Sequence, residues 1–132
     1  MSMKVLMVEP DQVPYVTVIG SNLSSMQTAV GGLIQVLYPF EDDEVALVCN
    51  EEAKLESLPL NRALFDTETH RLYDIVSGTF FICAAPSDSD SFGSLSDEQI
   101  GLYEKQFHCP EIFIRLNGNI QVIRKLPKQD LV

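Results

Sequence analysis

Near its middle the chain has a short apolar run that leads directly into a dense polar stretch, and few folds accommodate both. Residues 45–49 are all apolar and predict a buried strand. Asn50 follows as a candidate helix N-cap, with Glu51 and Glu52 in the first turn, where the helix dipole favours negative charge. Leu58 precedes a proline and avoids the helical conformation, so we expect the turn to end there.

A second polar group follows Pro59. Asn61 is placed to cap another short turn, residues 62–65, which would bring the guanidinium of Arg62 close to two carboxylates and two amides. Two interpretations are open. In the first, these residues are helix caps and a surface ion pair. In the second they line a binding site, whose residues would be Asn50, Glu51, Glu52, Asn61 and Arg62.

Further short apolar runs predict the rest of a sheet. They are rich in β-branched and aromatic residues and are bounded by turn residues. These runs are residues 4–9, 16–19, 33–38, 72–76 and 79–83. Ser77 and Gly78, between the last two runs, predict either a hairpin turn or a bulge.

Two segments have the periodicity of a helix. Residues 23–30 follow the candidate cap Asn22 and precede a Gly-Gly pair, which is typical of a left-handed C-terminal cap. Residues 97–107 follow Ser96, which forms a capping box with Gln99. The sequence therefore predicts a single α+β domain: a mainly antiparallel sheet of about five or six strands, two principal helices and a C-terminal β-hairpin.

The C-terminal segment predicts that hairpin most strongly. Residues 112–116 and 120–124 flank an Asn-Gly-Asn loop, and a three-residue loop would pair Leu116 with Ile120 and Ile114 with Val122. Both faces would carry apolar residues, which a lone ribbon cannot bury. We divide the chain into a core, residues 1–111, and a hairpin with a basic tail, residues 112–132. The second part either belongs to the same domain or is an arm through which a homodimer forms.

Charge is distributed unevenly along the chain. The net charge is −10: residues 1–111 hold five Lys or Arg against eighteen Asp or Glu, which gives −13, and residues 112–132 hold four against one, which gives +3. Phosphate binding needs clustered cations, so direct nucleic-acid binding through the acidic body is disfavoured. An acidic surface can instead keep a protein in solution or face a basic protein partner.

The N-terminal residues predict no membrane segment. The apolar run at residues 5–8 is too short for a signal peptide or a span, and Glu9 and Pro10 interrupt it. We expect a cytoplasmic protein without membrane contact. Three cysteines with no C-x-x-C pair agree with that placement.

No catalytic or metal-binding motif of known spacing occurs in the sequence. Phosphate-binding glycine loops, nucleophile elbows and zinc spacings are missing. Asp88 and Asp90 alternate as in a calcium loop, but the glycine and the distal glutamate of such a loop are absent. His108 and Cys109 are adjacent, yet neighbouring side chains at a helix end diverge. We therefore predict no catalytic residue, metal or cofactor, and favour a binding protein over an enzyme.

Several segments together form a recognisable pattern. The most specific are Asn50-Glu51-Glu52 and the Leu-Pro-x-Asn-Arg element at residues 58–62, and the others are residues 5–9, 30–32, 46–55, 74–81 and 95–100. In these the chain, up to about Phe107, resembles an uncharacterised family of bacteriophages and mobile elements of Gram-positive bacteria, the domain of unknown function numbered 3846. Ala53 stands where that family often has glycine, and the terminal hairpin is not matched. The resemblance implies a genetic context and a common fold, without an activity.

Three classes of function follow. The first is a non-enzymatic accessory protein of a phage or mobile element that binds another protein, with Asn50, Glu51, Glu52, Asn61 and Arg62 lining the contact. The second is an acidic DNA mimic that occupies a basic groove on a host nuclease or regulator. The third is a small-ligand binder or enzyme that uses Asn50, Glu52, Asn61 and Arg62, with Arg62 clamping an anionic group. The direction of Arg62 relative to Glu51 and Glu52 separates the third class from the others.

Overall fold

The computed structural model describes residues 1–127 and residue 130. These residues form nine strands and two helices, and the predicted α+β fold with a mainly antiparallel sheet is confirmed. In chain order the elements are β1 (Ser2–Val8), β2 (Tyr15–Gly20), α1 (Leu23–Val30), β3 (Ile34–Leu37), β4 (Val45–Asn50), β5 (Leu60–Phe65), β6 (Leu72–Ser77), β7 (Phe80–Ala84), α2 (Asp97–Phe107), β8 (Glu111–Leu116) and β9 (Asn119–Arg124).

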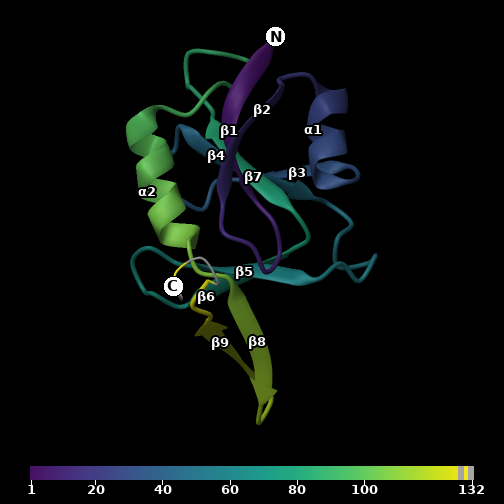
Figure 1. Cartoon of the computed structure of the whole chain (residues 1–132), viewed down its shortest axis with the longest axis vertical. Coiled ribbons are helices and arrows are strands. Elements are labelled where there is room, and N and C mark those ends of the chain that lie inside the picture. The colour runs from purple at the N-terminus through teal and green to yellow at the C-terminus, as the bar shows by residue number, and fades with distance from the viewer. Residues whose placement is uncertain (128–129, 131–132) are drawn as a thin grey trace.

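A five-stranded sheet forms the centre of the molecule, with α1 and α2 on either side of it (Figure 1). Its strand order is β2-β1-β7-β4-β3, and all neighbours are antiparallel. Every residue of β4 and β7 is buried, because side chains on both faces of these strands join an apolar cluster. This two-sided cover explains why the predicted strand at residues 45–49 is continuously apolar.

Each helix covers one face of the sheet. Met26 and Val30 of α1 belong to the cluster on one face, and Tyr103 and Phe107 of α2 belong to the cluster on the other. Both helices have the predicted bounds. The end of α1 is the predicted left-handed cap, with Gly31 at φ 80°, and α2 begins with the predicted capping box.

A two-stranded ribbon, β5 paired with β6, lies across one end of the sheet (Figure 1). The prediction of a turn at residues 62–65 capped by Asn61 is wrong, because this segment belongs to β5. Pairing with β6 and burial of residues 61–64 outweigh the local capping preference of an asparagine. No helix forms after Asn50, although its Oδ1 accepts from the N–H of Glu52 as a cap would. Residues 51–57 form turns with one helical hydrogen bond, from the N–H of Glu56 to the carbonyl oxygen of Glu52 at 2.9 Å, and Ser57 has φ 56°.

Gly78 marks the point where the chain changes from the ribbon to the central sheet. The prediction of a hairpin or bulge at this point is wrong, because β6 pairs with β5 while β7 inserts between β1 and β4. Gly78 has φ 74°, and its N–H donates to the carbonyl oxygen of Pro59 at 2.7 Å. A Cβ here would lie 2.9 Å from Leu58 Cδ1, so both conformation and space favour glycine.

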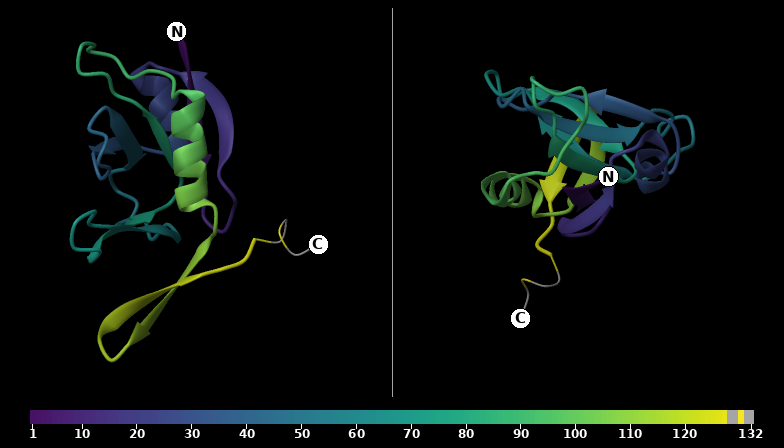
Figure 2. Two further views of the ribbon diagram at one scale, coloured as in Figure 1. Left: turned by 90° about the vertical axis from the view of Figure 1, so that its left-hand side faces the viewer. Right: turned by 90° about the horizontal axis from the view of Figure 1, so that it is seen from above.

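The predicted C-terminal hairpin, β8 with β9, projects from the end of the molecule opposite the N-terminus (Figures 1 and 2). Its turn has two residues, Asn117 at φ 51° and Gly118 at φ 83°. Leu116 pairs with Asn119, so the predicted three-residue loop, which pairs Leu116 with Ile120, is wrong by one residue. Two residues with positive φ form a type I′ turn, whose twist suits a hairpin better than the longer loop.

The observed register sorts the hairpin side chains into two different faces. Residues directly opposite one another share a face, and successive residues alternate. One face carries Ile112, Ile114, Leu116 and Ile123 together with Asn119 and Gln121, and we call it the aliphatic face. The other face carries Phe113, Val122, Ile120 and three charged residues, Glu111, Arg115 and Arg124. Within residues 112–132, Lys128, Gln129, Leu131 and Val132 lie outside the described residues.

Candidate functional site

Asn50 ends β4 as a buried hydrogen-bonding residue. Its Nδ2 donates to the carbonyl oxygen of Val30 at 3.3 Å and to Glu56 Oε1 at 3.4 Å, and its Oδ1 accepts from the backbone N–H of Glu52 at 2.8 Å. A Cβ on residue 32 would lie 2.9 Å from Asn50 Nδ2, so Gly32 leaves room for this amide. Asn50 therefore joins the end of α1 to the turn at residues 51–57.

The two acidic residues after Asn50 are on the surface. Glu51 and Glu52 are exposed, and neither forms an ion pair with any described residue. The short turns at residues 51–57 place them at the end of β4, away from the buried core that contains Arg62. The structure therefore does not bring the carboxylates and the guanidinium together.

Asn61 is fully buried in β5 and connects three segments. Its Nδ2 donates to the carbonyl oxygens of Val8 at 3.0 Å and Gly78 at 2.8 Å, while its Oδ1 accepts from Arg62 Nη1 at 2.9 Å. These bonds attach the ribbon to the end of β1 and to the crossing at Gly78. A side chain whose donors and acceptor are all used in this way stabilises the fold.

Arg62 is also fully buried, so its interpretation as part of a surface ion pair is wrong. Nε and Nη2 donate to the carbonyl oxygen of Phe107 at 3.1 and 2.9 Å, and Nη2 donates to that of Gln12 at 2.6 Å. Nη1 donates to Asn61 Oδ1 and to the Asn61 carbonyl oxygen at 3.4 Å. These bonds use all five N–H donors of a guanidinium.

The environment of Arg62 is mostly made of backbone dipoles. Phe107 is the last residue of α2, where helix carbonyl groups carry partial negative charge and attract cations. Burial lowers the pKa of Arg62, and the carboxylate of Glu111 opposes that shift. Arg62 therefore fastens α2 and the β1–β2 loop to the ribbon. Binding an external anion would require the guanidinium to leave these carbonyl groups.

Glu111 is a buried carboxylate that no sequence pattern singles out. Its side chain is 5% exposed, and Oε1 accepts from the backbone N–H of Ala63 at 2.7 Å. Burial raises its pKa, while the bond from Ala63 and the charges of Arg62 and Arg124 act in the opposite direction. The first residue of β8 is thereby attached to the outer edge of β5, which fixes the base of the hairpin.

The cysteines and His108 do not form a nucleophile with a base. Burial raises the pKa of Cys49 to about 11 and that of Cys83 to about 12, which suppresses the reactive thiolate. The ring nitrogens of His108 contact carboxylates and not Cys109: Nδ1 lies 2.7 Å from Glu104 Oε1, and Nε2 lies 2.9 Å from Asp130 Oδ2. In residues 1–127 and 130, no group of three or more His, Cys, Asp or Glu side chains could hold a metal ion.

A groove of about 510 Å³ lies between α2, the loop before β4 and the β5–β6 turn. Its apolar surface consists of aromatic and aliphatic side chains, and acidic residues and a histidine stand around them. We call it the aromatic groove and define it by Phe40, Phe65, Leu102 and Tyr103, with Glu41, Asp42, Asp66 and His70. Three separate segments supply these residues, so no local sequence pattern could have revealed the groove.

Comparison with protein-family models matches residues 3–108 to one family, "Domain of unknown function (DUF3846)". The chain belongs to this family. The resemblance seen in the sequence is thus confirmed. The DUF3846 match contains all five predicted site residues, the aromatic groove and both helices, and it ends before β8.

Comparison with curated proteins and with solved structures finds no match to this DUF3846 chain. Across the described residues, no helix combines the length and apolar character that a membrane span needs.

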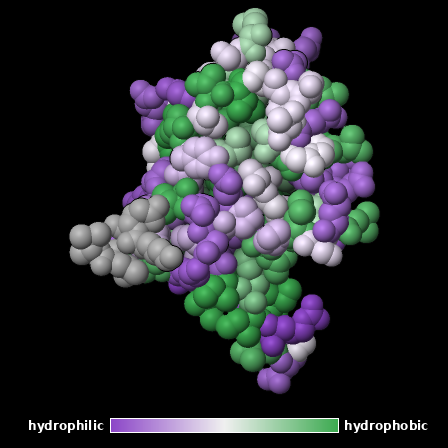
Figure 3. Space-filling model, turned by 45° about the vertical axis from the view of Figure 1, so that its right-hand side comes forward, coloured by the Kyte–Doolittle hydropathy of each residue, from purple (hydrophilic) through white to green (hydrophobic). Residues whose placement is uncertain are grey.

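The hairpin that follows the DUF3846 match exposes its aliphatic face. Ile112, Ile114, Leu116 and Ile123 are between 39% and 55% exposed. The space-filling view shows hydrophobic side chains over much of the projecting hairpin, with polar residues at its tip (Figure 3). This face is the clearest apolar surface on an element that extends beyond the body.

Proposed function

We propose that this DUF3846 chain is a non-enzymatic accessory protein that binds another protein through the aliphatic face of its β8–β9 hairpin. The observation that carries the proposal is this exposed face on a projecting hairpin. A two-stranded hairpin is marginally stable alone in water, and burial of Ile112, Ile114, Leu116 and Ile123 against a partner would stabilise it. Its setting in a phage or mobile element is part of the proposal and comes from the family resemblance.

The arrangement of the polar residues supports binding over catalysis. Arg62 and Asn61 use their donors on backbone and side-chain oxygens of the chain itself, and Cys49 and Cys83 are buried with raised pKa values. Contact through Asn50, Glu51, Glu52, Asn61 and Arg62 stays a prediction. Of these, the exposed Glu51 and Glu52 are the ones that a partner could reach without disturbing the fold.

Affinity capture from a cell extract, with a matched pair of variants, tests the proposal. Ile114→Asp places a charge on the aliphatic face, and Val18→Asp does the same on β2, where Val18 is 61% exposed. We expect tagged wild-type protein and the Val18 variant to retain the same partner from a cell extract, and the Ile114 variant to lose it. Equal retention by all three proteins would contradict a role for the hairpin.

The acidic body favours a second candidate, a DNA mimic that occupies a basic groove on a nuclease or regulator. Residues 1–111 carry a net charge of −13, and exposed acids such as Glu51 and Glu52 have no cationic partner among the described residues. Mimicry predicts that affinity for the basic partner collapses between low and moderate salt. Binding through the aliphatic face retains most of its affinity over the same range, because burial of apolar surface supplies most of it and charge pairs at its edge only a part, so a salt titration distinguishes the two candidates.

A further inference from the structure

The aromatic groove has an apolar floor that is open to solvent. The ring centroids of Phe40 and Tyr103 are 4.5 Å apart, and these rings continue into the core through Phe107. Leu102 is 60% exposed and Phe65 is 42% exposed on the walls of the groove. The groove thus offers aliphatic and aromatic surface that the chain itself leaves uncovered.

Tyr103 contributes a hydroxyl group to the lining of the groove. Its side chain lines the groove and the residue is 3% exposed, yet no described residue forms a hydrogen bond with its hydroxyl. The carboxylate of Asp42 is close enough to influence this hydroxyl electrostatically. The hydroxyl is not one of the buried side-chain atoms that lack a hydrogen-bond partner, so water in the groove can reach it, and a polar group of a ligand can replace that water.

The edge of the groove is negatively charged. Glu41, Asp42 and Asp66 are exposed, and no described Lys or Arg forms an ion pair with any of them. Cations are also attracted to the faces of aromatic rings such as Phe40 and Tyr103. The groove therefore suits a segment that carries aliphatic side chains together with Lys or Arg.

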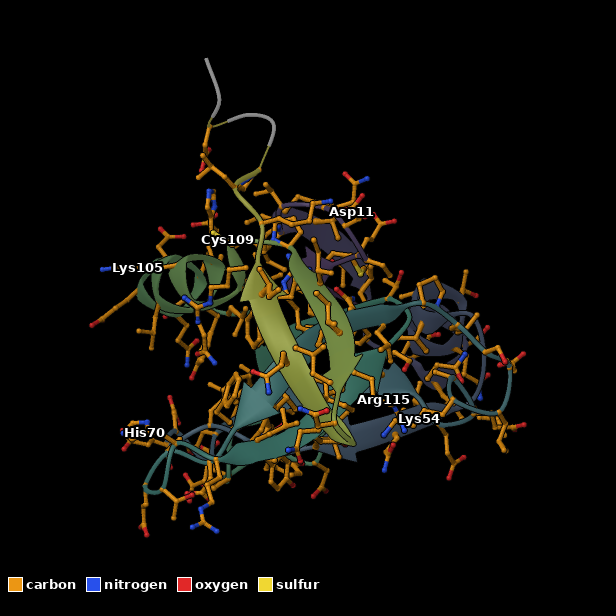
Figure 4. The ribbon with its side chains drawn as sticks, turned by 90° about the horizontal axis from the view of Figure 1, so that it is seen from below. Asp11, Lys54, His70, Lys105, Cys109 and Arg115 are labelled. Carbon is orange, nitrogen blue, oxygen red and sulfur yellow. The ribbon has the colours of Figure 1, made fainter. Side chains whose placement is uncertain are left out.

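The hairpin of the same chain has this composition. The face opposite its aliphatic face carries Arg115 near the tip and Arg124 near the base, and residues 112–132 carry a net charge of +3. In the view from below, Arg115 on the hairpin and the groove residue His70 lie well apart (Figure 4), so the hairpin tip does not fill the groove of its own chain. The hairpin can only reach the groove of another molecule.

The placement of hairpin and groove suits a two-fold arrangement. The hairpin tip and the β5–β6 turn lie on the same side of α2 (Figure 2, left). In a two-fold dimer the same face of each subunit meets its counterpart, so both elements must lie on a common face if they are to be exchanged reciprocally. Each dimer would then contain two equal contacts between hairpin and groove.

We infer that a second copy of this chain inserts its β8–β9 hairpin into the aromatic groove, and that the exchange is reciprocal. The inference rests on the proposed function, since it names the partner that the hairpin binds. The aliphatic face covers Leu102 and Phe65, while Arg115, which projects from the opposite face of the inserted hairpin near its tip, extends around the hairpin edge toward the carboxylates at the edge of the groove. The contact removes apolar surface on both sides from water and pairs opposite charges.

Sedimentation equilibrium on the purified full-length protein tests this inference. We expect a dimer at about 10 µM and at least a tenfold weaker association for either Ile114→Asp in the hairpin or Leu102→Asp in the groove. The Val18→Asp control should associate as the wild type does. Circular dichroism checks that each variant is folded, and Glu41→Lys, which reverses an exposed charge, replaces Leu102→Asp if that variant unfolds.

Mixing the two defective variants gives a sharper result. Ile114→Asp retains an intact groove and Leu102→Asp retains an intact hairpin, so the mixture should form heterodimers that neither variant forms alone. A wild-type protein that is monomeric at about 100 µM overturns the inference, while the hairpin can still bind a different protein in the extract experiment. A Leu102→Asp protein that dimerises as well as wild type also overturns it, because the contact then lies between hairpins alone.

Discussion

At the scale of single residues, the buried polar side chains hold separate parts of the chain together. Among the described residues, no carboxylate lies within ion-pair distance of Arg62. The charge of its guanidinium is balanced mainly by the carbonyl groups of Gln12, Asn61 and Phe107. Residues 12 and 107 are distant from Arg62 in sequence. The guanidinium thus makes the stability of the ribbon depend on the position of α2 and of the β1–β2 loop.

Replacing Arg62 should therefore be costly. Arg62→Ala leaves buried carbonyl oxygens without donors and opens a cavity, and we expect the free energy of unfolding to fall by about 3 kcal/mol or more. Urea denaturation measures this loss. Arg71→Ala, at an exposed arginine, is the matched control and should change stability by less than about 0.5 kcal/mol. Similar losses for the two variants would contradict the structural role of Arg62.

The thiols provide a second test at this scale. Burial raises the pKa of Cys49 to about 11 and of Cys83 to about 12, whereas Cys109 is partly exposed. At pH 8 we expect a disulfide reagent to modify one thiol of the native protein rapidly and all three after unfolding in guanidinium chloride. Mass spectrometry should place the early modification on Cys109. Rapid modification of Cys49 or Cys83 in the native protein would show that the core is open.

The sequence revealed the importance of Asn61 and Arg62 but not their role. Their closeness to Glu51 and Glu52 in sequence suggested caps and an ion pair, since those interactions are local. Their actual partners lie up to 53 residues away, at Val8, and only the packed fold brings them together. Glu111 and Tyr103 were missed for the same reason: each has the local sequence of an ordinary strand or helix residue.

At the scale of elements, local signals gave correct predictions where local interactions dominate. The capping box of α2 and the glycine at the end of α1 fixed both helices to the residue. The ribbon β5–β6 was only partly recognised, because strand pairing and burial decided the conformation of residues 61–65. The hairpin was recognised from its Asn-Gly pair, but the choice between a two-residue and a three-residue loop depends on backbone twist, which the sequence pattern does not resolve.

The end of α2 should respond to pH through His108. Hydrogen bonds to Glu104 and then to Asp130 raise the pKa of His108 above its ordinary value of 6.5. A raised pKa means that the folded protein holds the proton more tightly than the unfolded protein. The contribution to stability is therefore complete below pH 6.5 and disappears as the pH rises through the folded pKa. The ion pairs are partly exposed, so the effect should be small.

Nuclear magnetic resonance of the His108 ring should measure a pKa above 6.5, and melting temperatures between pH 6 and 8 should fall slightly in the wild type. His108→Gln should remove that slope while Asp130→Asn reduces it. A His108 ring that titrates at or below 6.5 would contradict the two contacts.

At the scale of the whole molecule, the protein consists of a sheet with both faces covered and a hairpin, β8–β9, that projects from it. The five-stranded sheet buries both faces under α1 on one side and α2 with the ribbon on the other, and Arg62, Asn61 and Glu111 attach the remaining parts to it. The hairpin lies outside that arrangement and outside the residues matched to DUF3846. Its aliphatic face and positive charge complement the aromatic groove with its carboxylates, and this complementarity is the basis of the account of function.

Hydrogen–deuterium exchange at two protein concentrations tests whether the hairpin of one molecule docks into the aromatic groove of another. We predict that raising the full-length protein from about 1 µM to about 100 µM slows amide exchange in β8, β9 and the groove residues 102–106, while α1 is unchanged. Protection in the hairpin and the groove together is the result that reciprocal docking requires. Exchange in β8 and β9 that is equally fast at both concentrations, or protection that appears only in α1 and β2, would contradict it.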